Sequence, residues 1–308
     1  MLVIGSRGSA LALAQSTWVK DQILNRFPGT PVTIKVIKTS ADKDTTSSLR
    51  SGAGIGVFVK EIEEALLSDD IDLAVHSMKD LPTRIPDTLE IGTVPEREDP
   101  RDALIVAGQA SSIVDLPGGA VVGTGSVRRQ AQILALRPDL RILDIRGNVD
   151  TRLRKLASGA YDAILLACAG LNRLGLNGRV TSRLSFDQML PAPGQGALAL
   201  EIRRDYCVTR SLIAALHHLP SAASVLAERA FLRRMGGGCN VPIAVHARCG
   251  EGKISIDGLV AALDGSRVIR ESITEDCARG EEAATALAER ILALGGENLL
   301  DAVHQSGP

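Results

Sequence analysis

The chain has 308 residues, of which 45% are hydrophobic and 23% charged, a composition typical of a folded globular protein with about two or three domains. Its formal net charge of −1 gives no reason to expect nucleic acid or a membrane surface as a partner. Aromatic residues make up only 2% of the chain, which argues against the stacking platforms that bind single-stranded nucleic acid.

Apolar strand-like runs alternate with helical patterns over the first two-thirds of the chain, which is typical of an α/β architecture with parallel strands. We expect strands at residues 2–5, 32–38 and 71–76, and helices at 10–26 and 57–67. Ser9 is a good cap for the first of these helices, and the sequence Phe27-Pro28-Gly29 ends it.

A charged, proline-bounded block at residues 95–102 is a candidate hinge or crossover, and a second α/β unit follows it. This unit has expected strands at 121–123, 141–145 and 162–167 and a helix at 127–136. The breaker Pro-Ala-Pro-Gly-Gln-Gly at 191–196 then precedes a strand-like run at 197–202. From about residue 219 the pattern becomes a helix at 221–234, strands at 243–248, 253–263 and 267–274, and a helix at 281–294. Short turns between these strands predict a small α+β domain with an antiparallel sheet.

The two α/β units share one local device. Gly-Ser-Arg-Gly-Ser at 5–9 and Gly-Thr-Gly-Ser at 123–126 each stand between a strand and a helix. Each places backbone N–H groups and a hydroxyl at a helix N-terminus, where the helix dipole favours anions. Taken singly, each segment also fits ordinary helix capping. The matching pair favours two lobes that face an anionic ligand in a cleft between them.

Arginines form the second signal, because they gather where strands of the two units are expected to end. In an open α/β sheet, ligands bind beyond the carboxyl ends of the strands, and the guanidinium fork matches carboxylate or phosphate. Any single arginine is otherwise at home on a solvated helix surface. The set consists of Arg7, Arg128, Arg129, Arg146, Arg152 and Arg173.

His76-Ser77-Met78-Lys79-Asp80-Leu81-Pro82 follows an expected strand and offers a carboxylate beside an amine. Asp80 is a candidate acid or base if the cleft raises its pKa, and Lys79 is a candidate anion ligand. The alternative is that Asp80 only forms a turn before Leu-Pro.

Cys239 lies in the sequence Met-Gly-Gly-Gly-Cys-Asn-Val-Pro at 235–242, where three glycines leave the thiol accessible. The helix before it is expected to end at Gly236. A thiol past a helix C-terminus has its pKa raised, which is unfavourable for an activated nucleophile. Permanent attachment of a group to Cys239 therefore fits better than turnover, although His246 is a possible base.

The remaining cysteines and the histidines show no metal-ligand spacing and no C-x-x-C pair. We therefore expect a metal-free protein with reduced thiols. The N-terminal apolar stretch is too short, and polar residues follow it too soon, for a signal peptide. No apolar run approaches the about 20 residues needed to span a membrane, so a cytoplasmic protein is expected.

Together, seven motifs resemble those of the porphobilinogen deaminase (hydroxymethylbilane synthase) family. They occur in consistent order along the chain: GSRGSALA at 5–12, HSMKD at 76–80, EREDPRD at 96–102, RRQ at 128–130, RGN at 146–148, PGQG at 193–196 and GGC at 237–239.

The resemblance implies a transferase of tetrapyrrole and heme biosynthesis that joins four porphobilinogen molecules head to tail and releases hydroxymethylbilane. It implies a dipyrromethane cofactor bound through a thioether to Cys239, with Asp80 as the catalytic residue. Each porphobilinogen carries an acetate and a propionate, which suits the arginines. The family's cofactor- and substrate-binding side chains match Arg7, Ser9, Phe58, Ser77, Lys79, Thr124, Ser126, Arg128, Arg129, Arg146, Arg152, Arg173 and Gln195.

The resemblance also implies the architecture: two α/β lobes similar to solute-binding proteins, joined by a hinge, and a small C-terminal α+β domain. The first lobe comprises residues 1–96 and 197–216, the second 97–196, and the third domain, with the cysteine, 217–308. The chain departs from the family at Ile55, where many members have a lysine, and at Gly125, where serine is common. A monomer is expected.

Two other functions remain open. A two-lobed anion-binding protein without catalysis explains the arginines but not the glycine-rich cysteine segment. A cysteine-dependent acyl transferase would use Cys239 and His246. Adding porphobilinogen to the protein and assaying for ammonia and porphyrin distinguishes the deaminase from these two alternatives.

Overall fold

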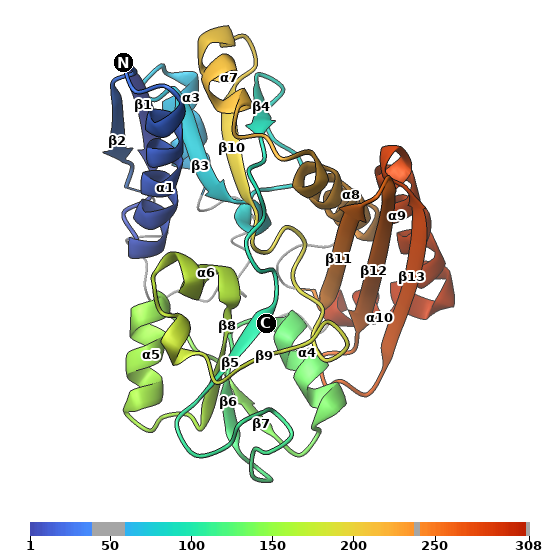
Figure 1. Ribbon diagram of the computed structural model, residues 1–308. Coiled ribbons are helices and arrows are strands. Elements are labelled where there is room, and N and C mark those ends of the chain that lie inside the picture. Colours follow the sequence, from blue (N-terminus) through green and yellow to red (C-terminus); the bar gives the residue numbers. More distant parts are fainter. Residues whose placement is uncertain (39–58, 237–240, 306–308) are drawn as a thin grey trace.

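The computed structural model describes residues 1–38, 59–236 and 241–305. Figure 1 shows two α/β lobes, one above the other, with a third domain beside both of them. No described helix is long and apolar enough to cross a membrane.

The first lobe is built on a five-stranded sheet of order β2-β1-β3-β10-β4. Strands β1, β2 and β3 run parallel, whereas β10 is antiparallel to β3 and β4. Ile4, Leu73 and Leu200 form part of its buried core. The elements are β1 (Leu2–Ser6), α1 (Ala10–Arg26), β2 (Val32–Val36), α3 (Lys60–Leu67), β3 (Leu73–Ser77), the 3₁₀ turn η1 (Met78–Asp80), β4 (Leu89–Thr93), β10 (Leu198–Arg203) and α7 (Cys207–Ala214).

The second lobe repeats this topology with the order β7-β6-β8-β5-β9. Here β6, β7 and β8 are parallel, and β5 is the antiparallel strand. The elements are β5 (Asp102–Val106), β6 (Val121–Gly123), α4 (Val127–Leu136), β7 (Arg141–Leu143), α5 (Val149–Ala157), β8 (Ala163–Ala167), α6 (Cys168–Arg173), η2 (Asn177–Arg179) and β9 (Ser182–Arg183).

In each sheet four strands therefore point the same way, since β4 runs with β3 and β9 with β8. The expected parallel arrangement is wrong for the predicted strand β10, and β5, which was not predicted as a strand, is antiparallel as well. These two strands carry the chain between the lobes, because β5 enters the second lobe after β4 and β10 returns to the first (Figure 1). A strand that arrives from the other lobe enters its sheet against the direction of the neighbouring strands.

The third domain has an antiparallel sheet of order β11-β12-β13 packed against helices, as predicted. Phe231 on α8 is fully buried against this sheet, where a Cβ on Gly258 would come within 2.6 Å of its ring. Helix α8 ends at Gly236, with φ of 64°, at the predicted residue. The elements are α8 (Leu219–Met235), β11 (Ile243–Gly250), β12 (Lys253–Ala261), β13 (Val268–Asp276), η3 (Cys277–Arg279), α9 (Gly280–Ile291), the π-turn η4 (Leu292–Gly296) and α10 (Glu297–Gln305).

The expectation of reduced thiols is wrong for two cysteines. Cys249 and Cys277 form a disulfide, with an S–S distance of 2.06 Å and a Cα–Cα distance of 6.1 Å. The cause is the sheet register: Cys249 lies opposite Ile254 near the end of β11, and β13 ends opposite Lys253, just before Cys277. The 28-residue separation hides this proximity in the sequence. Among the described residues, Cys168 and Cys207 are free.

The two linkers between the lobes, residues 94–101 and 184–197, are bound to each other and to the third domain. Glu98 N–H donates to the carbonyl of Gly196 over 3.2 Å. Gly196 has φ of 90°, and a Cβ there would lie 2.3 Å from the carbonyl oxygen of Glu98, so the linkers approach too closely for another residue. The block 95–102 is thus the crossover that its composition predicted.

Glu228 of α8 joins both linkers to the third domain. Its fully buried carboxylate accepts from Arg97 Nη1 over 2.7 Å and Nη2 over 3.0 Å. The N–H of Gly194 donates to it over 2.6 Å and that of Ala247 over 2.8 Å. Burial alone would raise the pKa of Glu228, but Arg97 and His246 hold it at about 2. The carboxylate is therefore the common anchor of three chain segments.

Candidate functional site

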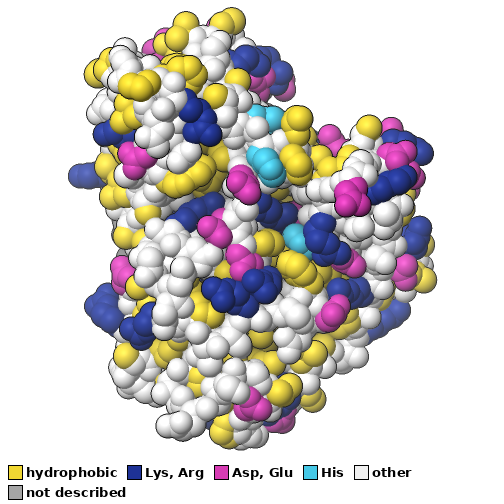
Figure 2. Space-filling view, in the orientation of Figure 1, with side chains coloured by type: hydrophobic (Ala, Val, Ile, Leu, Met, Phe, Trp, Pro, Cys, Tyr) yellow, Lys and Arg dark blue, Asp and Glu magenta, His cyan; other side chains and the backbone are white. Residues whose placement is uncertain are grey.

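A cavity of about 340 Å³ lies between the two lobes, and residues of both form its wall. In Figure 2, lysine and arginine side chains gather along the middle of this face of the molecule, where the lobes meet. Four cationic side chains, Arg7, Lys79, Arg129 and Arg152, line the cavity, against the two carboxylates Asp80 and Asp150. The wall therefore has a positive balance, which favours an anionic ligand.

The first lobe contributes the segment after β1. Arg7 and Ser9 follow this strand and line the cavity, both half-buried. Ser9 Oγ accepts from the N–H of Ala12 over 3.3 Å and so caps α1. The sequence pattern of strand, Gly-Ser-Arg-Gly-Ser and helix thus places an arginine at the cavity beside a helix start.

The first lobe also contributes Ser77, Lys79 and Asp80, which follow β3 and line the cavity. The short turn η1 is held from behind, because Met78 N–H donates to the carbonyl of Ala197 over 3.0 Å. Burial lowers the pKa of Lys79; Asp80 opposes this shift and Arg129 adds to it. Asp80 itself is exposed, so its carboxylate is accessible to a ligand.

Gln15 of α1 was not among the predicted site residues, yet it lines the same cavity and is almost fully buried. Its Nε2 donates to Ser77 Oγ over 3.0 Å and so fixes that hydroxyl. Gln15 is one of several polar residues within α1, and no local pattern distinguishes it from them.

The second lobe contributes Arg129 and Arg152. Arg152 Nε donates to the carbonyl of Gly147 over 2.8 Å, which orients its guanidinium at the start of α5. Burial, and then repulsion by Arg129, lower the pKa of Arg152 to about 10. The cations on the wall therefore repel one another, and a bound anion would relieve that repulsion.

The two predicted hydroxyls of the second lobe serve the start of α4. Thr124 Oγ1 accepts from the N–H of Ser126 over 3.1 Å, and Ser126 Oγ accepts from the N–H of Arg129 over 3.5 Å. Neither residue is among the described residues that line the cavity. Their contacts in this structure are those of a helix cap.

Arg128, Arg129 and Gln195 meet at a buried carboxylate, Asp102, which was not among the predicted site residues. Asp102 is fully buried at the start of β5 and accepts hydrogen bonds from all three side chains. Of the three, only Arg129 lines the cavity. The structure thus places Arg128 and Gln195 behind Arg129. Asp102 is the last residue of the EREDPRD motif, and this motif is the sequence feature that could have identified it as a site residue.

Arg146 and Arg173 bind partners other than the groups that line the cavity. Arg146 Nε donates to Asp144 Oδ2 over 2.6 Å. Arg173 Nη2 donates to the carbonyl of Gly196 over 2.7 Å, so it binds the second linker, and burial lowers its pKa to about 10. Neither is among the described residues that line the cavity.

Cys239, Phe58 and Ile55 lie outside the described residues. The chain leaves α8 at Gly236 and returns at Val241, which is buried in the core of the third domain. His246, the alternative base for Cys239, is buried, with Nδ1 3.4 Å from Glu228 Oε1 and its ring stacked on Phe186 at 4.2 Å. Among the described residues no group of three or more side chains could hold a metal ion.

The chain matches two family models. Residues 2–211 match "Porphobilinogen deaminase, dipyromethane cofactor binding domain", and residues 222–293 match "Porphobilinogen deaminase, C-terminal domain". Porphobilinogen deaminase of Thermus thermophilus is 50% identical over 301 residues, which cover 97% of this chain and 98% of the relative. That of Geobacter sulfurreducens is 48% identical over 304 residues, covering 99% and 95%.

A weaker likeness exists to a solved structure, the periplasmic aliphatic sulphonate binding protein of Escherichia coli. It has a TM-score of 0.41 and 15% identity, covering 75% of this chain and 69% of that one.

Proposed function

The chain belongs to the porphobilinogen deaminase family, and from this premise we propose that it is a hydroxymethylbilane synthase. It joins porphobilinogen molecules head to tail, releases one ammonia for each, and hydrolyses the linear tetrapyrrole hydroxymethylbilane from a dipyrromethane primer. One observation carries this proposal: Asp80 and four cationic side chains line a single cavity between the lobes.

The cavity fits the primer in charge. Two pyrrole rings that each carry an acetate and a propionate present four carboxylates, and Arg7, Lys79, Arg129 and Arg152 line the wall. These four residues are the ones that we expect to hold the primer. When bound, the dipyrromethane supplies the nucleophilic pyrrole carbon to which the first substrate is joined.

Asp80 is the proposed catalytic residue. Each condensation breaks a carbon–nitrogen bond of the substrate, forms a carbon–carbon bond and removes a proton from the attacking pyrrole carbon. The Asp80 carboxylate stabilises the positive charge that develops as ammonia leaves, and it accepts the proton. Its exposure at the cavity and its place on the turn η1 support this role.

Cys239 is the proposed anchor of the primer, through a thioether. Its segment begins at Gly236, directly after α8, and α8 packs against the first lobe through Ala222 and Val225. Glu228 of the same helix binds both linkers. The anchor segment is thus attached to a helix that is fixed beside the cavity.

We also infer the domain limits of the enzyme, its cellular location, its oligomeric state and its partners. The two five-stranded sheets and the antiparallel sheet support a division into residues 1–96 with 197–216, 97–196, and 217–308. We expect a cytoplasmic monomer that acts on a small molecule, without nucleic acid or membrane as a partner.

The test is incubation of the purified protein with porphobilinogen, followed by assays for ammonia and for porphyrin formed from the released tetrapyrrole. The proposal predicts both products. Binding of porphobilinogen without ammonia would instead support a non-catalytic anion-binding protein. If the protein neither binds porphobilinogen nor releases ammonia from it, both readings are overturned, and acyl transfer is the function to assay.

A further inference from the structure

The strongest unassigned feature is the carboxylate of Asp102, which is fully buried beside the cavity. Its Oδ2 accepts from Arg128 Nη1 over 2.7 Å. Its Oδ1 accepts from Arg129 Nε over 3.0 Å and Nη2 over 2.7 Å, and from Gln195 Nε2 over 2.9 Å. A buried carboxylate with four such donors is strongly committed to its ionised form.

The charges around Asp102 explain why an acid is needed there. Arg128 and Arg129 are adjacent on α4 and both nearly fully buried, so without a counter-charge they would repel each other at low dielectric. Burial alone would raise the pKa of Asp102, but the two arginines hold it well below its usual range. One carboxylate therefore allows two adjacent arginines to remain charged, Arg129 in the cavity wall and Arg128 behind it.

The contacts of Arg129 show what Asp102 does for the site. Nε and Nη2 of Arg129 donate to Asp102, and Nη1 donates to the carbonyl of Leu165 over 3.0 Å. These bonds use three of its five N–H groups, leaving one on Nη1 and one on Nη2. The plane of the guanidinium is thus fixed by three bonds, and Arg129 is at the same time one of the residues that line the cavity.

Gln195 connects the same carboxylate to the linker. Besides Asp102, its Nε2 donates to the carbonyl of Pro100 over 2.7 Å, and the N–H of Gln195 donates to the carbonyl of Ala192. Asp102 itself is the first residue after the other linker. Asp102 therefore lies where α4 and both linkers meet.

We propose that Asp102 is a positioning residue for the reaction: it fixes the guanidinium of Arg129 in the orientation that binds the carboxylates of primer and substrate. This inference rests on the proposed function for its ligand. Arg128 and Gln195 complete the shell around Asp102 and act through it. Asp102 has no role in bond making, because it is buried and is not among the described residues that line the cavity.

The test compares Asp102→Asn with Asp139→Asn. Asp139 pairs with Arg137 over 2.7 Å in the same lobe, but at an exposed site, so it controls for loss of an Arg–Asp pair. In Asp102→Asn the amide replaces one acceptor oxygen with a donor, so at least one arginine loses its partner. We expect KM for porphobilinogen to rise about tenfold or more, with a smaller change in kcat. Asp139→Asn should retain wild-type KM.

A second measurement tests how firmly the Arg129 side chain is held, and it does not depend on enzyme activity. With ¹⁵N-labelled arginine, the Arg129 Nε–H resonance is assigned by its loss in Arg129→Lys. We expect this resonance to exchange slowly with water in the wild type and fast in Asp102→Asn, whereas Asp139→Asn leaves it unchanged. If Asp102→Asn does not fold, Gln195→Met, which removes only the neutral donor to Asp102, should accelerate the same exchange by a smaller factor.

The outcomes separate this inference from the proposed function. Wild-type protein that releases no ammonia from porphobilinogen defeats the proposed function, while the Nε–H exchange still tests the hold of Asp102 on Arg129. Active wild type together with unchanged KM and unchanged Nε–H exchange in Asp102→Asn overturns the positioning role. A loss of melting temperature with unchanged KM and exchange would likewise reduce Asp102 to a structural residue.

Discussion

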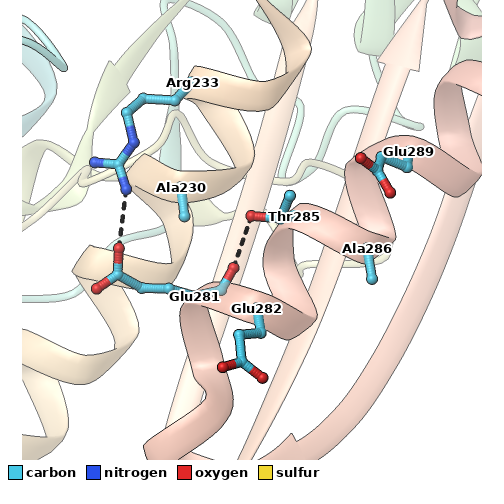
Figure 3. Close-up of a pocket in the computed structure, with 7 residues that line it drawn as sticks. All are labelled: Ala230, Arg233, Glu281, Glu282, Thr285, Ala286 and Glu289. Carbon is cyan, nitrogen blue, oxygen red and sulfur yellow. Dashed lines mark hydrogen bonds and ion pairs between the residues drawn. The ribbon is translucent and has the colours of Figure 1, made fainter.

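The junction between the lobes and the α8–α9 side of the third domain both gather charged side chains around a hollow, yet they differ in burial. Figure 3 shows the hollow between α8 and α9, about 430 Å³, where Arg233 Nη2 lies 2.9 Å from Glu281 Oε2. The Arg233 and Glu281 side chains are 42% and 53% exposed, whereas at the junction Arg128, Arg129 and Asp102 are almost fully buried.

The comparison shows that volume alone does not identify a functional site. The two hollows have similar volumes, about 430 and 340 Å³, but the charges of the α8–α9 hollow are solvated and paired within the surface. At the junction, Asp102 already neutralises the buried Arg128 and Arg129 in part, and the cations that line the cavity still outnumber its carboxylates. A bound anion would therefore stabilise this site. The α8–α9 hollow therefore supplies matched controls for substitutions of Asp80, Glu228 and Arg129.

The largest expected effect is on turnover, from Asp80→Asn. This change removes the proposed acid–base at the junction, and we expect ammonia release to fall by about 10²–10⁴-fold. Its surface counterpart, Glu289→Gln, should retain wild-type turnover. Measuring ammonia release under saturating porphobilinogen checks the prediction, and near-normal turnover of Asp80→Asn would remove Asp80 from the chemistry.

The next effect is on stability, from Glu228→Gln against Glu281→Gln. Removing the Glu228 charge leaves the buried Arg97 unpaired, so the free energy of unfolding should fall by about 3–5 kcal/mol. The exposed Arg233–Glu281 pair should contribute less than about 1 kcal/mol. Denaturant unfolding measures both, and equal losses would mean that burial does not separate the two regions.

The lowered pKa of Glu228 predicts that the free energy of unfolding depends on pH. The pKa of Glu228 falls from 4.5 to about 2 in the folded protein, so its stabilisation is fully present above about pH 4.5. It is lost as the pH falls towards 2. The wild type should therefore lose more stability than Glu228→Gln over this window, and parallel pH curves would contradict the assignment.

The smallest of these effects is on binding, from Arg129→Leu against Arg233→Leu. Loss of a charge-assisted contact with ligand carboxylates should raise KM or impair primer assembly by about 10–100-fold. Arg233→Leu should change neither. Steady-state kinetics and intact mass check both variants, and wild-type behaviour of Arg129→Leu would discredit the cavity as the binding site.

Much of the fold followed from local patterns. Strand β6 and helix α4 have the predicted bounds, and Gly236 ends α8 as its type and place predicted. Strand β5 was missed, because Asp-Ala-Leu-Ile-Val is a short apolar run directly after a proline-bounded charged block. The reversed direction of β5 and β10 was missed as well, since only the path of the chain between the lobes determines it.

For the site, the sequence predicted the residue types better than their partners. Arg7, Lys79, Asp80, Arg129 and Arg152 were expected near a ligand, and the structure brings them to one cavity. Arg128 meets Asp102 from 26 positions away, and Cys249 meets Cys277 from 28. Such pairs depend on strand order and register, and no local pattern predicts either.

The most direct test of the account is the intact mass of the wild-type protein as purified. The account predicts a mass greater than that of the sequence by one dipyrrole, lost in Cys239→Ser. The mass increment should persist in Cys207→Ser, which changes an exposed free cysteine of α7. An unmodified mass for wild-type protein that actively releases ammonia would contradict the account.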